Sequence, residues 1–196
     1  ILYGRNPEYV AGAVNGTVTM YITELRDISN VNPTIEVTDK SFLVKSNGDK
    51  WSYDTGDATI SLTDFNLPSV TSILIDGEPF NNFSLSGSNL VLKNAPGGDH
   101  IYTFIYGEVG YRVNGCVYAN GISTVAELET WRRNESYWYT ILLNDINYNG
   151  QTLITEGNKD NIIGVLDGRG YTISNFTHTT GFVNMLYGTN SVIKNV

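Results

Sequence analysis

The sequence predicts an all-β protein in two parts, a β-sandwich followed by the start of a parallel β-helix. Up to about residue 120, short segments rich in β-branched and aromatic residues alternate with turn sequences, at intervals of about 8–12 residues that are typical of sandwiches. Only one segment, 122–135, has helical periodicity. Beyond it, ISNF at 173–176 returns as IKNV at 193–196, which indicates a repeating unit.

Composition excludes several classes of protein. The chain has 196 residues, of which 41% are apolar and only 16% charged, and its net charge is -8. An acidic, weakly charged surface repels phosphate backbones, so we expect no nucleic acid partner. No segment approaches the ~20 apolar residues of a membrane span. Cys116 is the single cysteine, so an intramolecular disulfide is impossible and we interpret it as a small buried residue.

The first part contains a series of predicted strands. Turn sequences separate them, among them NGD at 47–49, TGD at 55–57, DGE at 76–78, SGS at 86–88 and PGG at 96–98. Together they predict an antiparallel sandwich. The predicted strands lie at 17–25, 34–38, 41–46, 50–54, 58–65, 70–76, 89–93, 100–107 and 110–119.

Residues 70–113 carry a resemblance. The stretch VTSILIDGEPFNNFSLSGSNLVLKNAPGGDHIYTFIYGEVGYRV resembles the second half of bacterial immunoglobulin-like modules, with a DG hairpin, an L-x-L strand and a G-x-H turn into a long strand. The resemblance implies an Ig-like β-sandwich over 39–120. Residues 1–38 are either the rest of that sandwich or the tail of a preceding module.

The predicted helix lies in ISTVAELETWRRNE. Thr124 is the expected N-cap and Glu127 follows three residues later, which is the capping-box pattern. Val125, Leu128 and Trp131 lie on one face at a spacing of three. We expect this helix to cover the first coil of the stack, with Trp131 packed over that coil, because an open end leaves apolar side chains and backbone groups bare.

The repeat predicts stacked strands. A strand expected at 137–150 ends in a polar turn, and alignment of Ile173 with Ile193 also aligns Asn175 with Asn195, 20 residues later. We therefore expect these pairs to stack in successive coils about 4.8 Å apart, with Ser174 and Lys194 facing outward. Gly168, Gly170, Gly181 and Gly188 suit tight corners.

The order of motifs after residue 121 carries a second resemblance. Four motifs resemble, in the same order, the start of GLUG-type β-helix domains of large bacterial surface proteins. They are STVAELETW, YTILLNDINYNG, GVLDGRGYTISNFT and GFVNMLYGTNSVIKNV. In the last of them, GFVNMLYG departs from the usual GLFG by an insertion. The resemblance implies a capping helix and N-terminal coils of a right-handed parallel β-helix over 121–196, in an extracellular or cell-surface protein. Since two coils are few for a solenoid, we expect the natural protein to continue beyond residue 196.

Candidate chemical residues are few. Asp145 and Asp167 on the coils could form the carboxylate pair of a glycosidase, or serve as turn residues. Asp49, Asp54 and Asp57 lack the ligand spacing of an EF-hand and suit hairpin turns. His100 and His178 have no zinc or nucleophile motif around them, and neither does Cys116. We therefore predict no catalytic, cofactor-binding or metal-binding residues and no cofactor.

Aromatic residues offer the remaining binding signal. WSY at 51–53 and SYWY at 136–139 could stack on sugar rings, or pack in the core.

The sequence thus predicts a non-catalytic structural or binding segment of a bacterial surface protein, adhesin-like, with carbohydrate or a host or cell-surface protein as its partner and an undetermined oligomeric state. A phage fibre or tailspike subunit, located in the virion, is one alternative. A β-helix polysaccharide-degrading enzyme with its active site beyond residue 196 is the other.

Overall fold

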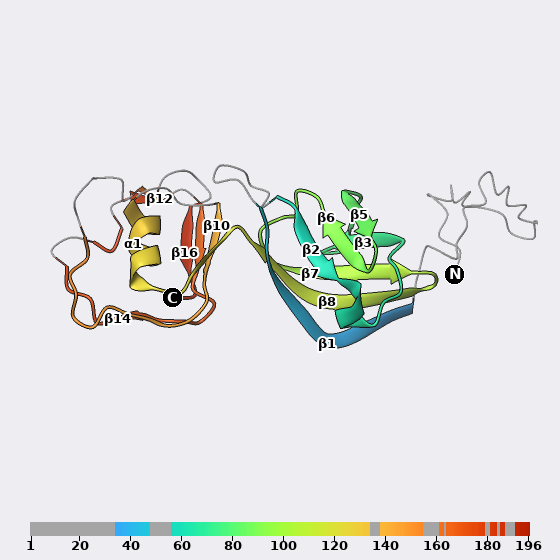
Figure 1. The fold of residues 1–196 in the computed structure, drawn as a ribbon, viewed down its shortest axis with the longest axis horizontal. Helices are drawn as coiled ribbons and strands as arrows, with labels where there is room; N and C mark the ends of the chain where they lie inside the picture. Colours follow the sequence, from blue (N-terminus) through green and yellow to red (C-terminus); the bar gives the residue numbers. More distant parts are fainter. Residues whose placement is uncertain are drawn as a thin grey trace, which may run out of the picture.

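The computed structural model describes residues 34–47, 56–133, 138–154, 161–162, 164–178, 181–183, 185–186 and 191–196. Over these ranges the protein is mostly β-structure with a single α-helix, which confirms the all-β prediction at the level of class. Two lobes lie end to end along the long axis of the molecule (Figure 1). The strands predicted at 17–25 and 50–54 fall outside the described residues.

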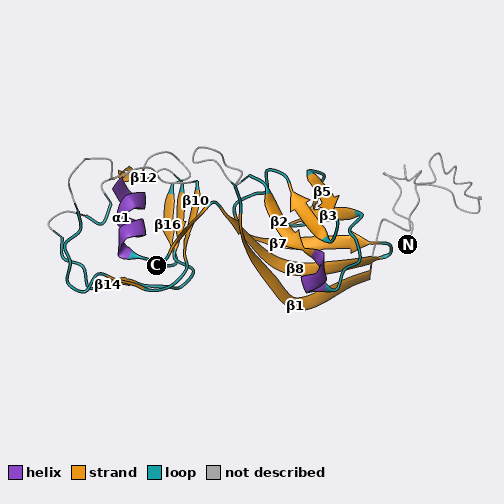
Figure 2. Ribbon diagram, viewed as in Figure 1, coloured by secondary structure: helices purple, strands orange, loops and turns teal. Residues whose placement is uncertain are grey.

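The first lobe consists of two sheets. A five-stranded sheet has the order β1-β8-β7-β3-β4 and a three-stranded sheet has the order β2-β6-β5 (Figure 2). The strands are β1 Thr34–Lys45, β2 Ala58–Ser61, β3 Ser72–Ile75, β4 Glu78–Phe80, β5 Phe83–Ser86, β6 Asn89–Leu92, β7 Gly98–Tyr106 and β8 Val109–Tyr118.

Both sheets contribute to one hydrophobic core. Ile60 and Leu92 come from the smaller sheet, Tyr102 and Phe104 come from the larger one, and all four are buried. The Phe42 ring lies over Gly115, where a Cβ atom would come within 2.0 Å of the ring. A larger residue than glycine would therefore displace Phe42 from the core.

Three of the strand predictions in the first lobe need correction. The strands expected at 34–38 and 41–46 are one strand, β1, with an irregularity between Val37 and Ser41, and β1 runs parallel to β8 in a sheet predicted to be antiparallel. The segment 34–38, left open between two modules, thus pairs within the first lobe. The strand expected at 58–65 ends at Ser61, and a 3-10 helix follows at Leu62–Phe65. Its threefold repeat points Leu62 and Phe65 into the core together.

The DG hairpin forms as predicted. Asp76 and Gly77 link β3 to β4 with φ of 53° and 90°, and Ile75 is paired with Glu78. Two successive positive φ angles are the mark of the type I′ turn that this dipeptide favours.

The second lobe consists of parallel ladders. β10, β13 and β16 pair side by side and extend a ladder that begins with β9, while β11 pairs with β14 and β12 with β15. The chain therefore visits three faces in turn and returns to the first. The elements are β9 Asn120–Ile122, α1 Val125–Arg133, β10 Tyr139–Leu142, β11 Ile146–Asn147, β12 Asn161–Ile162, β13 Val165–Asp167, β14 Ile173–Ser174, β15 Met185–Leu186 and β16 Val192–Lys194.

Helix α1 begins as the sequence predicts. The Glu127 N–H donates to Thr124 Oγ1 over 3.2 Å, and the Thr124 N–H donates to the Glu127 carboxylate over 3.0 Å, which completes the capping box. Leu128 and Trp131 are buried in a second core with residues of β9, β10, β11 and β13, and Val125 packs against it. The expectation that Trp131 packs over the first coil is confirmed.

The predicted stacking register is wrong. Ile173 pairs with Ile146 in the β11–β14 ladder, whereas Ile193 pairs with Leu166 in the β13–β16 ladder, so Ile173 and Ile193 lie on different faces. The 20-residue interval instead relates two corners of the same local conformation, since Asn175 and Asn195 have φ of 54° and 55°. Residues that stack in these two ladders lie 27 positions apart.

Candidate functional site

Asp167 is the best-connected carboxylate in the described part of the chain. It ends β13, and its side chain is completely buried. Tyr139 donates its hydroxyl to Oδ2 over 3.0 Å, and the Asn195 amide and the Arg169 N–H each donate to Oδ1 over 3.0 Å. The Lys194 ammonium lies 3.2 Å from Oδ2.

These contacts hold Asp167 ionised. Burial acts to raise the pKa of this carboxyl, but the bonds from Asn195, Arg169, Lys194 and Tyr139 outweigh it and lower the pKa below its ordinary value. The pKa of Tyr139 is raised, first by burial and then by the Asp167 charge, so its hydroxyl remains a donor. A carboxylate that is ionised at neutral pH and has its oxygens occupied suits a structural corner better than a general acid.

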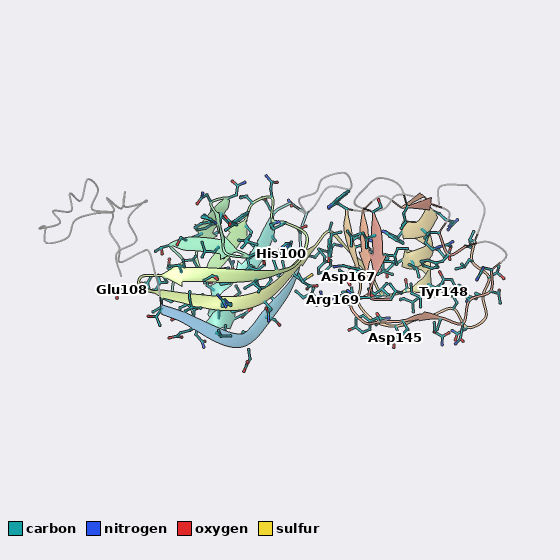
Figure 3. The ribbon with its side chains drawn as sticks, turned by 180° about the vertical axis from the view of Figure 1, so that it is seen from behind. His100, Glu108, Asp145, Tyr148, Asp167 and Arg169 are labelled. Atoms are coloured by element: carbon teal, nitrogen blue, oxygen red, sulfur yellow. The ribbon has the colours of Figure 1, made fainter. Side chains whose placement is uncertain are left out.

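Asp145, the other member of the suggested catalytic pair, has different contacts. It is exposed, and Oδ1 accepts the Thr172 N–H over 2.8 Å and the Thr172 hydroxyl over 3.1 Å. Figure 3 labels both carboxylates on the second lobe. Asp145 and Asp167 share no bonding partner, and each fixes a corner between coils, so the structure favours the turn interpretation.

A hollow of about 530 Å³ lies where the two lobes meet. Within it, Arg169 of the second lobe forms an ion pair of 2.8 Å with Asp99 of β7. His100 Nδ1 lies 2.6 Å from Asp76 Oδ2, and this bond, followed by the one from the Ile101 N–H, lowers the pKa of Asp76. His100 therefore has bonding partners within the first lobe. The hollow is also lined by Ser41, Leu43, Asn114 and Cys116.

Cys116 is buried, as the sequence predicts. Burial first, and then the charge of Asp99, raises the pKa of its thiol to about 12. At neutral pH the group is a thiol, and nucleophilic chemistry requires the thiolate.

A buried polar network under α1 was not anticipated from the sequence. Glu129 and Arg132 are buried, and Arg132 Nη1 donates to both carboxylate oxygens over 2.9 and 3.0 Å. The Tyr148 hydroxyl donates to Glu129 over 2.7 Å, and Arg132 Nε donates to the Phe182 carbonyl over 2.7 Å. Burial raises the pKa of Tyr148, with its bond to Glu129 as the next cause. The only sequence signal was an acid and a base three positions apart on a helix.

The remaining candidates do not converge on a site. Asp57 pairs with Lys93 over 2.6 Å, while Asp49 and Asp54 lie outside the described residues. No group of three acidic, histidine or cysteine side chains able to hold a metal ion occurs in the described ranges. His178 is exposed, with its ring 5.6 Å from that of Phe176.

The suggested aromatic platforms are only partly described. Tyr139 is buried between the lobes, Trp138 is half-buried, and residues 51–53 and 136–137 lie outside the described ranges. Tyr139 therefore presents no open face to a sugar ring.

Comparisons with known proteins found no matching family, no matching curated protein and no matching solved structure. Among the described residues, no helix has the length and apolar character needed to cross a membrane.

Proposed function

We propose that this chain is a non-catalytic structural and binding segment of a large extracellular bacterial surface protein. In this proposal the first lobe is an Ig-like spacer, and the second lobe is the capped beginning of a right-handed parallel β-helix that carries adhesion further along the molecule. The observation that supports it best is the ladder β9-β10-β13-β16, accompanied by the β11–β14 and β12–β15 ladders. Such a stack buries a continuous core and can be lengthened coil by coil.

The carboxylates add further support. In this proposal Asp145 and Asp167 serve the corners of the scaffold, because their oxygens bind donors from the next coil. Fold alone does not decide function, since parallel β-helices also serve as lyases and hydrolases. The proposal therefore needs a test of activity as well as a test of location.

The location test uses antibodies raised against the chain. We expect them to label intact cells of the organism that encodes it, and to bind none of the virions that those cells release. Labelled virions, together with a trimer of the full-length protein that resists SDS, would instead establish the phage-fibre alternative.

The activity test exposes the full-length protein to a panel of polysaccharides and measures new reducing ends and unsaturated products. We expect no turnover. Turnover that disappears in Asp167→Asn or Asp145→Asn, with the circular dichroism spectrum unchanged, would overturn the proposal. Turnover that survives both substitutions would place the active site in another part of the protein and support the enzyme alternative.

A further inference from the structure

The two lobes are joined without a linker. β8 ends at Tyr118 and β9 begins at Asn120, so a single residue, Ala119, separates the sheets. Its N–H donates to the Tyr139 carbonyl over 3.0 Å, which continues strand pairing across the junction. This leaves a bend at one hinge residue as the main way for the lobes to move apart.

Tyr139 fills the inner side of the junction. Its ring packs on the backbone of Gly98 in β7, where a Cβ atom would lie only 2.8 Å from the ring. The hydroxyl of the same residue is bonded to Asp167 in the second lobe. Tyr139 therefore packs against the first lobe while its hydroxyl is held within the second lobe.

The Asp99–Arg169 ion pair joins the two lobes at a more exposed part of the junction. Asp99 belongs to β7, and Arg169 lies in the turn that follows β13 (Figure 3). Arg169 has φ of 54°, a conformation that is held by its N–H bond to Asp167. The guanidinium is thus positioned by the corner of the second lobe while it binds the first.

Cys116 lies beside this ion pair. It is opposite Asp99 in the β7–β8 ladder and lines the same hollow as Arg169, yet only 2% of its surface is exposed. Asp99 and Arg169 are both close enough to influence the pKa of the thiol. The single cysteine of the chain is therefore a natural reporter of whether the junction is closed.

We propose that the Asp99–Arg169 pair is a latch that holds the two lobes in one orientation and keeps Cys116 sealed from solvent. The latch makes the two lobes one rigid unit at low ionic strength, and its release allows hinge motion about Ala119. This inference concerns the junction alone, so it stands or falls separately from the function proposed above.

The test measures the rate at which a thiol reagent labels Cys116 in the whole folded chain. Arg169→Gln should label about two- to fivefold faster than the parent, the range expected when one partly exposed ion pair is removed. The parent should also label faster when NaCl is raised from about 0.01 M to about 1 M, which shortens the Debye length from about 30 Å to about 3 Å. Arg169→Gln should lose most of this salt response.

Two controls separate the latch from general destabilisation. Lys93→Gln removes an ion pair of similar exposure within the first lobe, and it should leave the labelling rate unchanged. The charge swap Asp99→Arg with Arg169→Asp should restore slow labelling, since aspartate tolerates the positive φ at position 169. Unchanged labelling in Arg169→Gln, an equal increase in Lys93→Gln, or fast labelling in the charge swap would overturn the proposal.

Discussion

The side-chain amide of Asn195 donates a hydrogen bond of 3.0 Å to Asp167, a carboxylate that is completely buried. The same relationship joins Asn175 to Asn147 over 3.1 Å. In each case an asparagine with positive φ in one coil binds a short polar side chain in the coil before it. The two pairs hold equivalent corners together, which explains why asparagine occurs at both positions of the repeat.

The buried corner at Asp167 should contribute most to stability. Asp167→Ala leaves the Tyr139 hydroxyl and the Asn195 amide without their acceptor, so we expect it to lower the free energy of unfolding by roughly 2–4 kcal/mol. Asp145→Ala, at an exposed corner, should cost less than about 1 kcal/mol. Urea denaturation of both variants and the parent measures the difference. Equal losses would show that burial of Asp167 adds nothing.

The lowered pKa of Asp167 predicts a pH dependence. A carboxyl whose pKa is lower in the folded state stabilises the protein above its unfolded pKa of about 3.9, and this stabilisation is lost as pH falls through the folded pKa. The difference in unfolding free energy between the parent and Asp167→Asn should therefore be constant from about pH 5 to pH 8 and shrink below about pH 4. Asp76 and Glu127 also have lowered pKa values, but they are present in both proteins and cancel. A gap that widens in acid would contradict the assignment.

Local sequence signals predicted local structure well. The capping box at Thr124 and Glu127 and the Asp76–Gly77 turn depend on neighbouring residues, and both form. The stacking register could not be predicted in the same way, because it depends on how many residues the chain uses on all three faces of a coil. Ile173 and Ile193 share a local environment but stack on Ile146 and Leu166, respectively.

The candidate sites show the same contrast between local signals, which the sequence reveals, and long-range contacts, which it does not. Asp167 and Asp145 were identified from turn chemistry, whereas the burial of Glu129 and Arg132 depends on Tyr148 and Phe182, which lie far along the chain. Charged residues on a short helix normally indicate a solvated face. Similarly, nothing near Asp99 indicates that Arg169 will bind it from the other lobe.

The left-handed corner at Asn175 distinguishes backbone strain from hydrogen bonding. Asn175→Ala removes the bond to Asn147 and places a Cβ-bearing residue in a conformation that costs it about 1–2 kcal/mol, so we expect a total loss of about 1.5–3 kcal/mol. Asn175→Gly removes only the bond and should cost under about 1.5 kcal/mol. Thermal denaturation of both variants gives the comparison. A glycine variant that is less stable than the alanine variant would rule out conformational strain as the larger effect.

The core position Leu166 should be more sensitive than its stacking neighbour Ile193. Leu166 is completely buried and Ile193 is half-buried, so Leu166→Ala should cost about 2–5 kcal/mol and Ile193→Ala distinctly less. Ile173→Asp, at another half-buried position on the second core, should also destabilise the second lobe, because it introduces an unpaired carboxylate beside apolar side chains. The midpoint of urea unfolding, compared with that of the parent, measures the loss of stability in all three variants. Parent-like behaviour of Leu166→Ala would contradict the inward assignment of β13.

The buried network beneath α1 should respond differently to single and double substitution. Arg132→Met removes the nearer and buried cation of the Glu129 carboxylate and leaves only the half-exposed Arg133 at 3.8 Å, which should cost about 3–5 kcal/mol, whereas Arg133→Met should cost under about 1 kcal/mol. Adding Glu129→Leu to Arg132→Met removes the poorly compensated charge, so the double variant should recover much of the loss even though the Tyr148 hydroxyl then lacks its acceptor. Equilibrium unfolding of the single and double variants measures the coupling between the two residues. A double variant whose loss equals the sum of the losses in Arg132→Met and in Glu129→Leu alone would show that Glu129 and Arg132 do not act as a pair, because coupled residues give non-additive effects.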